Sequence, residues 1–139
     1  DHRAHADADA LAQALRAACP DGIDGCFENV GGRVFDAVLQ CCNDHARVAL
    51  CGLIAGQGAV PLPLANPRLL LVHRIQLEGF IVRDHLADWP RALAELGELV
   101  ASGALRPRES VAVGLENAPA ALLGLLKGEN FGKQLVRLV

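Results

Sequence analysis

The segment 47–54, with the sequence RVALCGLI, restricts the fold of this chain more than any other segment. It is nearly all apolar, and it is short enough to be a strand rather than a long helix. A strand with apolar residues on both faces is typical of a parallel sheet that helices cover on both sides. We therefore expect 47–54 to be a buried parallel strand.

Strand-like and helix-like segments alternate along the chain. Four further segments are predicted to be strands: 23–30, 75–82, 110–115 and 132–139. Apolar spacing and helix start and stop signals predict five helices, which begin at 7 or 9, 33, 67, 89 and 118 and end at 19, 43, 73, 103 and 128. This alternation indicates βαβ units with right-handed crossovers, so the predicted fold class is α/β with a mostly parallel sheet.

Composition excludes several classes of partner. The 139 residues carry a net charge of −3 with interspersed acidic and basic residues, and aromatic residues make up 4%. A nucleic-acid surface requires clustered Lys and Arg or aromatic stacking platforms, so no nucleic-acid partner is expected. No apolar run approaches the ~20 residues of a membrane-spanning helix, so no membrane partner is expected either.

The chain has five cysteines, an odd number, and each lies among apolar or small residues. No pair has the CxxC spacing of a metal or redox motif, and adjacent Cys41 and Cys42 cannot easily share one tetrahedral metal. We therefore expect reduced, buried thiols, a cytoplasmic location and no metal site.

Ligands of an open parallel sheet bind beyond the carboxyl ends of its strands. Those ends carry ENVGG at 28–32, CGLIAGQ at 51–57 and FIV at 80–82. Glycine allows a ligand to approach the backbone, and Asn29 offers an amide donor and acceptor. There is no GxGxxG, no complete phosphate loop and no GxSxG elbow. The residues alone leave open whether these glycines form turns only or a binding site.

The strings CPDGIDGCFENVGG, RVALCGLIAGQ, LEGFIVRDH, GLENAP and KGENFGK occur in this order. Together they resemble the zinc-independent medium-chain dehydrogenase/reductase family, in the branch of the prostaglandin reductases (leukotriene hydroxydehydrogenases) and their bacterial relatives. Members of this family bind NADP(H) and reduce the C=C bond of enones and enals by hydride transfer to the β-carbon. The resemblance thus implies an NADP(H)-dependent oxidoreductase that acts on small enones or enals.

Family chains are more than twice as long as this one. The resemblance implies that 1–109 is part of a Rossmann-like nucleotide-binding domain, and that 110–139 is a tail returning to the catalytic domain. The first nucleotide-binding strand with its glycine-rich turn has no counterpart here. We therefore expect the 139 residues alone to be inactive and to bind NADPH weakly. The sheet edge at 23–30 is expected to be bare, as are the apolar faces that the absent helices of the family would cover. A partner chain, domain exchange or disorder is expected to compensate.

The resemblance also implies a set of cofactor-binding residues, and it assigns no catalytic residue. The set is Asn29, Cys51, Gly52, Leu53, Ile54, Ala55, Gly56, Gln57, Phe80, Ile81, Val82 and Asn130. Backbone N–H groups of Ile81 and Val82 are expected to hold the nicotinamide carboxamide. Many relatives have Tyr at position 57, and this chain has no Tyr. A ribose hydroxyl and water then replace the phenol, or the substrate preference differs.

A hypothesis from another class is a non-catalytic α/β module that dimerises. Strand 75–82 would be an apolar edge strand, and such edges pair with a second copy. The reductase hypothesis implies a homodimer through the same strand. The two hypotheses differ over ligands, because Asn29→Ala should change cofactor binding only in a reductase.

Overall fold

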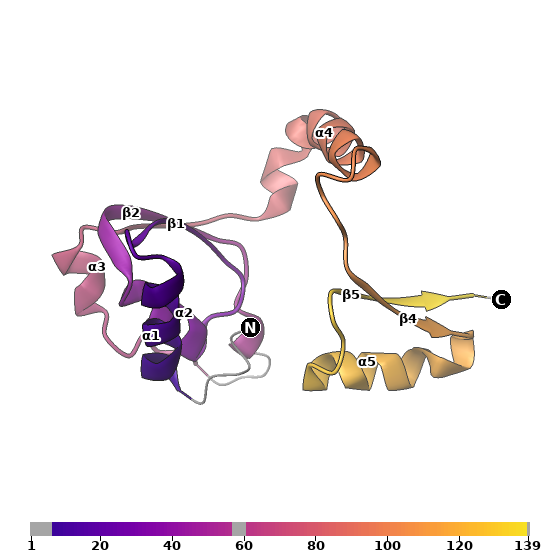
Figure 1. The fold of residues 1–139 in the computed structure, drawn as a ribbon, viewed down its shortest axis with the longest axis horizontal. Coiled ribbons are helices and arrows are strands. Elements are labelled where there is room, and N and C mark those ends of the chain that lie inside the picture. The colour runs from indigo at the N-terminus through magenta and orange to yellow at the C-terminus, as the bar shows by residue number, and fades with distance from the viewer. Residues whose placement is uncertain (1–6, 57–60, 139) are drawn as a thin grey trace. The chain divides into compact units, whose positions relative to one another are not determined.

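The computed structural model describes residues 7–56 and 61–138, and the predictions for 1–6, Gln57 and Val139 lie outside the described residues. The chain divides into two compact units, Asp1–Leu86 and Ala87–Val139 (Figure 1). The predicted boundary between 109 and 110 concerns the place of the chain in a whole enzyme, and it stays a prediction. Each unit is described below by itself.

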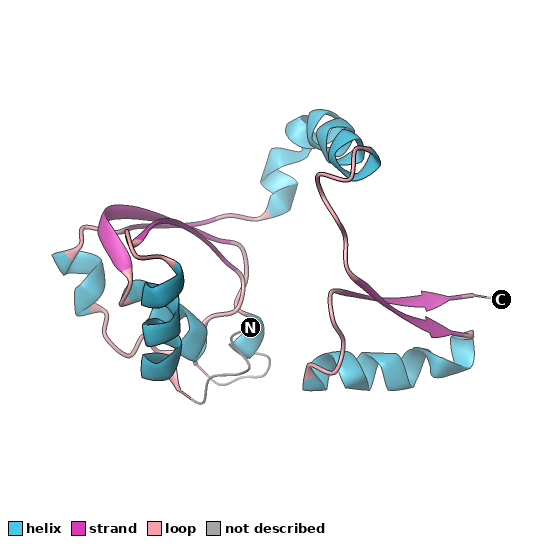
Figure 2. Ribbon diagram, viewed as in Figure 1, coloured by secondary structure: helices cyan, strands magenta, loops and turns pink. Residues whose placement is uncertain are grey.

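Unit 1 is built from a parallel three-stranded sheet in the order β1–β2–β3 (Figure 2). Its helices and strands are α1 (Ala8–Ala18), β1 (Ile23–Glu28), α2 (Gly32–Leu39), β2 (Cys42–Leu50), the 3₁₀ turn η2 (Ile54–Gly56), α3 (Arg68–Val72) and β3 (Gln76–Gly79). The 3₁₀ segment η3 (Val82–Asp88) follows and contains the boundary between the units. The predicted α/β class with parallel strands is confirmed.

The core of unit 1 lies on one face of the sheet. Phe35 and Leu39 of α2 pack against Val48 of β2, and all three are at most 3% exposed. Helix α1 packs beside α2, with Leu11 in a second buried cluster (Figure 1). The Asp7 side chain begins α1 by accepting a hydrogen bond of 2.8 Å from Ala10 N–H. Apolar residues at helical spacing therefore form the core that the sequence predicts.

The prediction that 47–54 is a strand covered on both faces is wrong in two respects. Strand β2 begins earlier, at Cys42, and ends at Leu50, while the preceding helix ends at Leu39 rather than at 43. In addition, unit 1 covers only one face of β2, since Phe27 on the other face of the sheet is 67% exposed. Helices on that second face do not occur among the described residues of unit 1.

A bulge at the amino end of β2 explains its early start. Ile23 pairs with Cys42 and Gly25 with Arg47, so residues 43–46 lie opposite Asp24 alone. The bulge depends on contacts between distant residues, which local periodicity does not report.

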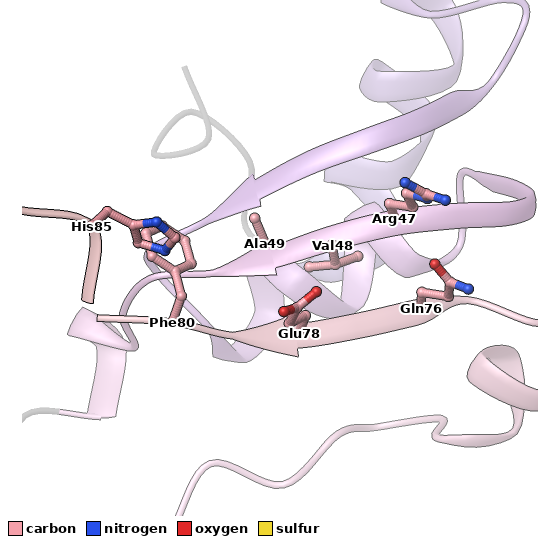
Figure 3. Close-up of a pocket in the computed structure, with 7 residues that line it drawn as sticks. All are labelled: Arg47, Val48, Ala49, Gln76, Glu78, Phe80 and His85. Atoms are coloured by element: carbon pink, nitrogen blue, oxygen red, sulfur yellow. The ribbon is translucent and has the colours of Figure 1, made fainter. Parts of the chain in front are cut away.

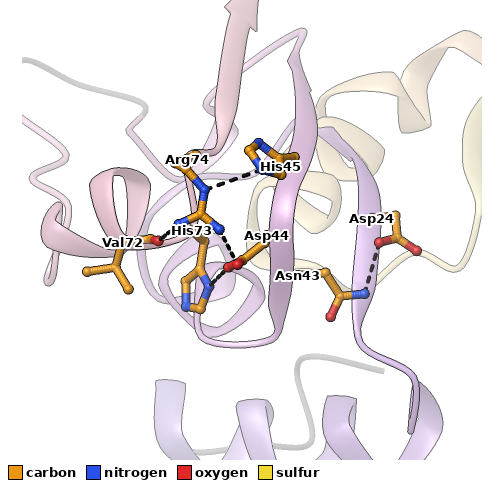
Figure 4. Close-up of polar contacts among 7 residues, drawn as sticks. All are labelled: Asp24, Asn43, Asp44, His45, Val72, His73 and Arg74. Carbon is orange, nitrogen blue, oxygen red and sulfur yellow. Dashed lines mark hydrogen bonds and ion pairs between the residues drawn. The ribbon is translucent and has the colours of Figure 1, made fainter.

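Charged contacts hold the bulge to the turn between α3 and β3 (Figure 4). The Asp44 carboxylate accepts from His73 Nδ1 at 2.9 Å and also from the Arg74 guanidinium. The His73 hydrogen bond and, after it, Arg74 lower the pKa of Asp44. His45 and Arg74 have positive φ angles of 65° and 49°, and His45 N–H donates to His73 C=O at 2.7 Å. These contacts fix β2 beside β3 at the amino ends of both strands.

All five cysteines are free thiols, but the expectation that they are buried is wrong for Cys51, which is exposed, and Cys19 and Cys26 are only half-buried. Burial raises the pKa of Cys42 to about 11, and burial also raises the pKa values of Cys26 and Cys41. These three thiols therefore stay protonated at neutral pH and are weak nucleophiles. No helix in 7–56 or 61–138 has the length and apolar character that crossing a membrane requires.

Unit 2 holds a separate parallel pair of strands, β4–β5. Its elements are α4 (Trp89–Ala101), β4 (Glu109–Val113), η4 (Leu115–Asn117), α5 (Ala118–Lys127) and β5 (Lys133–Arg137). Helix α5 is thus the crossover between its two strands, and Gly128 ends it in the left-handed conformation at φ 72°. The strands predicted at 110–115 and 132–139 are confirmed, with shorter carboxyl ends.

Candidate functional site

The carboxyl ends of the three strands of unit 1 lie at the same edge of the sheet. Glu28 pairs with Leu50, and Leu50 pairs with Gly79. The residues that follow, beginning at Asn29, Cys51 and Phe80, therefore start side by side. The structure brings together the predicted strand ends at 29, 52 and 81, as an open α/β ligand site requires.

Loop 29–31 follows β1 and loop 51–56 follows β2. Both loops donate hydrogen bonds to Glu28, which is only 3% exposed. Its carbonyl accepts from Cys51 N–H at 2.9 Å and from Gly52 N–H at 3.3 Å. Its carboxylate Oε1 accepts from Val30 N–H and Gly31 N–H, each at 2.6 Å. Glu28 belongs to the ENVGG string at the end of the predicted strand, but it was not among the predicted site residues.

Further backbone contacts continue this junction. Ile54 N–H donates to Asn29 C=O at 3.2 Å, and Ala55 N–H donates to Val30 C=O at 2.8 Å. Loop 51–56 therefore lies against loop 29–31 along its whole length.

Glycines lie where these two loops approach each other. A Cβ at Gly52 would lie 2.3 Å from Asn29 Oδ1, so the Asn29 side chain would have to leave its observed position. A Cβ at Gly31, where φ is +76°, would lie 2.8 Å from Leu53 Cδ2. Asn29 itself is exposed, so its amide is accessible to a ligand. An exposed amide above a glycine backbone suits the polar groups of a nucleotide cofactor.

The third strand end is aromatic and apolar. Phe80 N–H donates to Leu50 C=O at 3.1 Å, which places it beside β2. Its ring lies edge-on to Phe27 and to His85, with centroids 6.1 and 5.8 Å apart. Ile81 and Val82 follow and are 65% and 51% exposed. This end therefore offers exposed apolar surface next to the polar loops.

A pocket of about 520 Å³ opens on the uncovered face of the sheet (Figure 3). Arg47, Gln76 and Glu78 project into it from β2 and β3, while Phe80 and His85 lie at the carboxyl end of the strands. Of the predicted site residues only Phe80 lines it. The pocket is thus separate from the junction between the first two loops.

Two predicted residues fall outside the cluster at these strand ends. Gln57 lies outside the described residues. Asn130 belongs to unit 2, where its Nδ2 donates to Gly132 C=O at 2.7 Å and where it borders a pocket of about 390 Å³. The cofactor contact implied for Asn130 stays a prediction. Over 7–56 and 61–138, no group of three or more His, Cys, Asp or Glu side chains is arranged to hold a metal ion.

The chain is similar to several curated reductases. It is 44% identical over 138 residues to the NADPH-dependent curcumin reductase of Escherichia coli K12, 42% over 127 to the 2-alkenal reductase (NADP(+)-dependent) of Nicotiana tabacum, and 39% over 130 to prostaglandin reductase 1 of Mus musculus. These matches cover 94%, 91% and 91% of this chain and 40%, 37% and 40% of the relatives. The chain therefore spans about 40% of the length of its curated relatives.

A solved structure and a family match agree with these relatives. The crystal structure of CurA in complex with NADPH from Vibrio vulnificus superimposes with a TM-score of 0.80 at 41% identity, covering 97% of this chain and 42% of that one. Residues 1–98 match the family described as zinc-binding dehydrogenase. The resemblance to the medium-chain dehydrogenases/reductases is confirmed, and the chain belongs to the zinc-binding dehydrogenase family within them.

Proposed function

We propose that this chain forms part of the cofactor site of an NADP(H)-dependent oxidoreductase that reduces the C=C bonds of enones and enals. The observation that carries the proposal is the alignment of three strand ends, with the Asn29 amide above Gly52. The names of the relatives, which include an NADPH-dependent reductase and a 2-alkenal reductase, support the choice of cofactor and substrate class.

The residues of unit 1 bind and orient in this proposal. When bound, NADP(H) supplies the hydride. Asn29 and loop 51–56 hold the polar part of the cofactor, and the backbone at Ile81 and Val82 holds the carboxamide. Phe80 and the exposed apolar side chains beside it exclude water from one side of the nicotinamide ring of the bound cofactor. We assign no catalytic residue in this chain and no residue to proton delivery.

The experiment is an assay of the complete protein that carries this sequence, with NADPH and a 2-alkenal. NADPH consumption that depends on the alkenal is expected, and Asn29→Ala should raise the Kd for NADPH about fivefold because one amide contact is lost. The matched control is Asn66→Ala, at an exposed asparagine outside the site, which should leave the Kd unchanged. If Asn29→Ala leaves the Kd for NADPH unchanged, the proposal is contradicted.

The strand predicted at 75–82 is shorter in the structure, where β3 covers only Gln76–Gly79. We also propose a homodimer through β3, because it is an edge strand of the sheet and Leu77 on it is 39% exposed. Light scattering should give twice the chain mass, and Leu77→Lys should shift the protein towards monomer. Leu71→Lys, on α3 and already 78% exposed, is the control. A strict monomer at high concentration would count against this interface.

A non-catalytic dimerisation module predicts the same dimer, but it predicts no alkenal-dependent use of NADPH and no effect of Asn29→Ala on NADPH binding.

We further propose that the protein lies in the cytoplasm, where thiols stay reduced. The five free cysteines support this location.

A further inference from the structure

We propose that Glu28 is the positioning residue of the cofactor site, an inference that rests on the proposed function. It holds loop 29–31 with its side chain and loop 51–52 with its carbonyl group. Through these contacts Glu28 sets where the Asn29 amide lies relative to Gly52.

The first argument is the burial of the Glu28 carboxylate. A carboxylate that is 3% exposed must gain hydrogen bonds to replace the water it has lost. Oε1 meets this requirement with two short bonds of 2.6 Å, from Val30 N–H and Gly31 N–H. Both donors lie in the loop that carries Asn29, so the position of this loop depends on the Glu28 side chain.

The second argument is the beginning of α2. Its N-cap is Gly31, which has no side chain that could accept a hydrogen bond from the first turn. The amino end of a helix favours a nearby negative charge. The Glu28 carboxylate accepts from the N–H of this N-cap residue, so its negative charge lies beside the amino end of α2, although it bonds no N–H of the first turn.

The third argument is the coupling of the two loops. The Glu28 carbonyl accepts from Cys51 N–H and Gly52 N–H, so one residue contacts both loops. The Asn29 side chain lies over Gly52, so a shift of either loop changes the position of the amide relative to Gly52. Loss of the Glu28 carboxylate should therefore weaken NADPH binding without removing any atom that touches NADPH.

The test compares three variants at position 28 in the complete protein. Glu28→Ala removes the acceptor, Glu28→Asp shortens the side chain by one CH₂, and Glu28→Gln keeps a carbonyl oxygen at the same reach. We expect KM for NADPH to rise about fivefold in Glu28→Ala and Glu28→Asp, with kcat and the KM for the alkenal within about twofold of the original values. Glu28→Gln should recover most of the lost affinity.

The matched control is Asp36→Ala. Asp36 on α2 also accepts a backbone hydrogen bond, from Ala65 N–H at 2.9 Å, but it contacts neither loop. The Asp36→Ala variant should have a lower midpoint of thermal unfolding and an unchanged KM for NADPH. This result separates a positioning role from a general effect on stability.

Each outcome distinguishes the two proposals. If the original protein neither binds NADPH nor uses it with an alkenal, the proposed function fails. If it does both and Glu28→Ala is folded with an unchanged KM for NADPH, the positioning role fails alone. If Glu28→Ala does not fold, Glu28→Asp and Glu28→Gln decide: equal KM values for NADPH in these two overturn the role, and a higher value in Glu28→Asp supports it.

Discussion

Replacing Leu39 with Ala is expected to lower the free energy of unfolding by about 2–5 kcal/mol. Leu39 is 1% exposed and packs with Phe35 and Val48 between α2 and the sheet. The shortened side chain loses its transfer free energy and leaves a cavity that the surrounding helix and strands fill only partly. Urea unfolding of the chain, followed by circular dichroism, measures the change as a lower midpoint with an unchanged slope.

Leu71→Ala is the matched control, because it makes the same chemical change at a side chain that is 78% exposed. Its free energy of unfolding should stay within about 0.5 kcal/mol of the original value. Equal losses in the two variants would mean that the buried cluster of Phe35, Leu39 and Val48 does not form the core of unit 1.

Gly52→Ala is expected to raise the Kd for NADPH about fivefold, as Asn29→Ala does, since the same hydrogen-bonding group of the proposed site is displaced. The added Cβ would lie 2.3 Å from Asn29 Oδ1, so the amide must leave its position above the second loop. Titration of the complete protein with NADPH, followed by nucleotide fluorescence, measures the effect.

Gly25→Ala provides the comparison for this variant. Gly25 lies in β1, and a Cβ added there meets no atom within 4 Å. The Kd of the Gly25→Ala variant for NADPH should therefore differ from the original value by no more than about twofold. A Gly52→Ala variant that binds NADPH as tightly as Gly25→Ala does would show that the contact between Asn29 and Gly52 is not part of the site.

Local periodicity predicts the elements of unit 1 well and their ends less well. Apolar residues at helical spacing, such as Phe35 and Leu39, identify α2 because burial of one helix face needs that spacing. Of residues 40–43, which were expected at the end of this helix, 40 and 41 form a turn, and 42 and 43 enter β2. The bulge that starts β2 is held by Asp44, His73 and Arg74, and contacts between residues so far apart leave no local pattern.

The candidate site also has parts that the sequence predicts and a part that it does not. Glycine-rich strings after predicted strands correctly indicate loops at one edge of a parallel sheet, because topology alone places carboxyl ends together. Glu28 is different, since an acidic residue is usually exposed and nothing in its neighbours indicates burial. Only the folded loops bring two backbone N–H groups to its carboxylate.

The sequence by itself determined the α/β class, the parallel pairing and the strand ends that lie together at one edge of the sheet, because these follow from the alternation of apolar periods along the chain. The tertiary structure alone decided that β2 starts in a bulge and that Glu28 joins two loops. The physical reason is that burial and hydrogen-bond partners depend on residues far apart in the chain, whereas periodicity records only near neighbours.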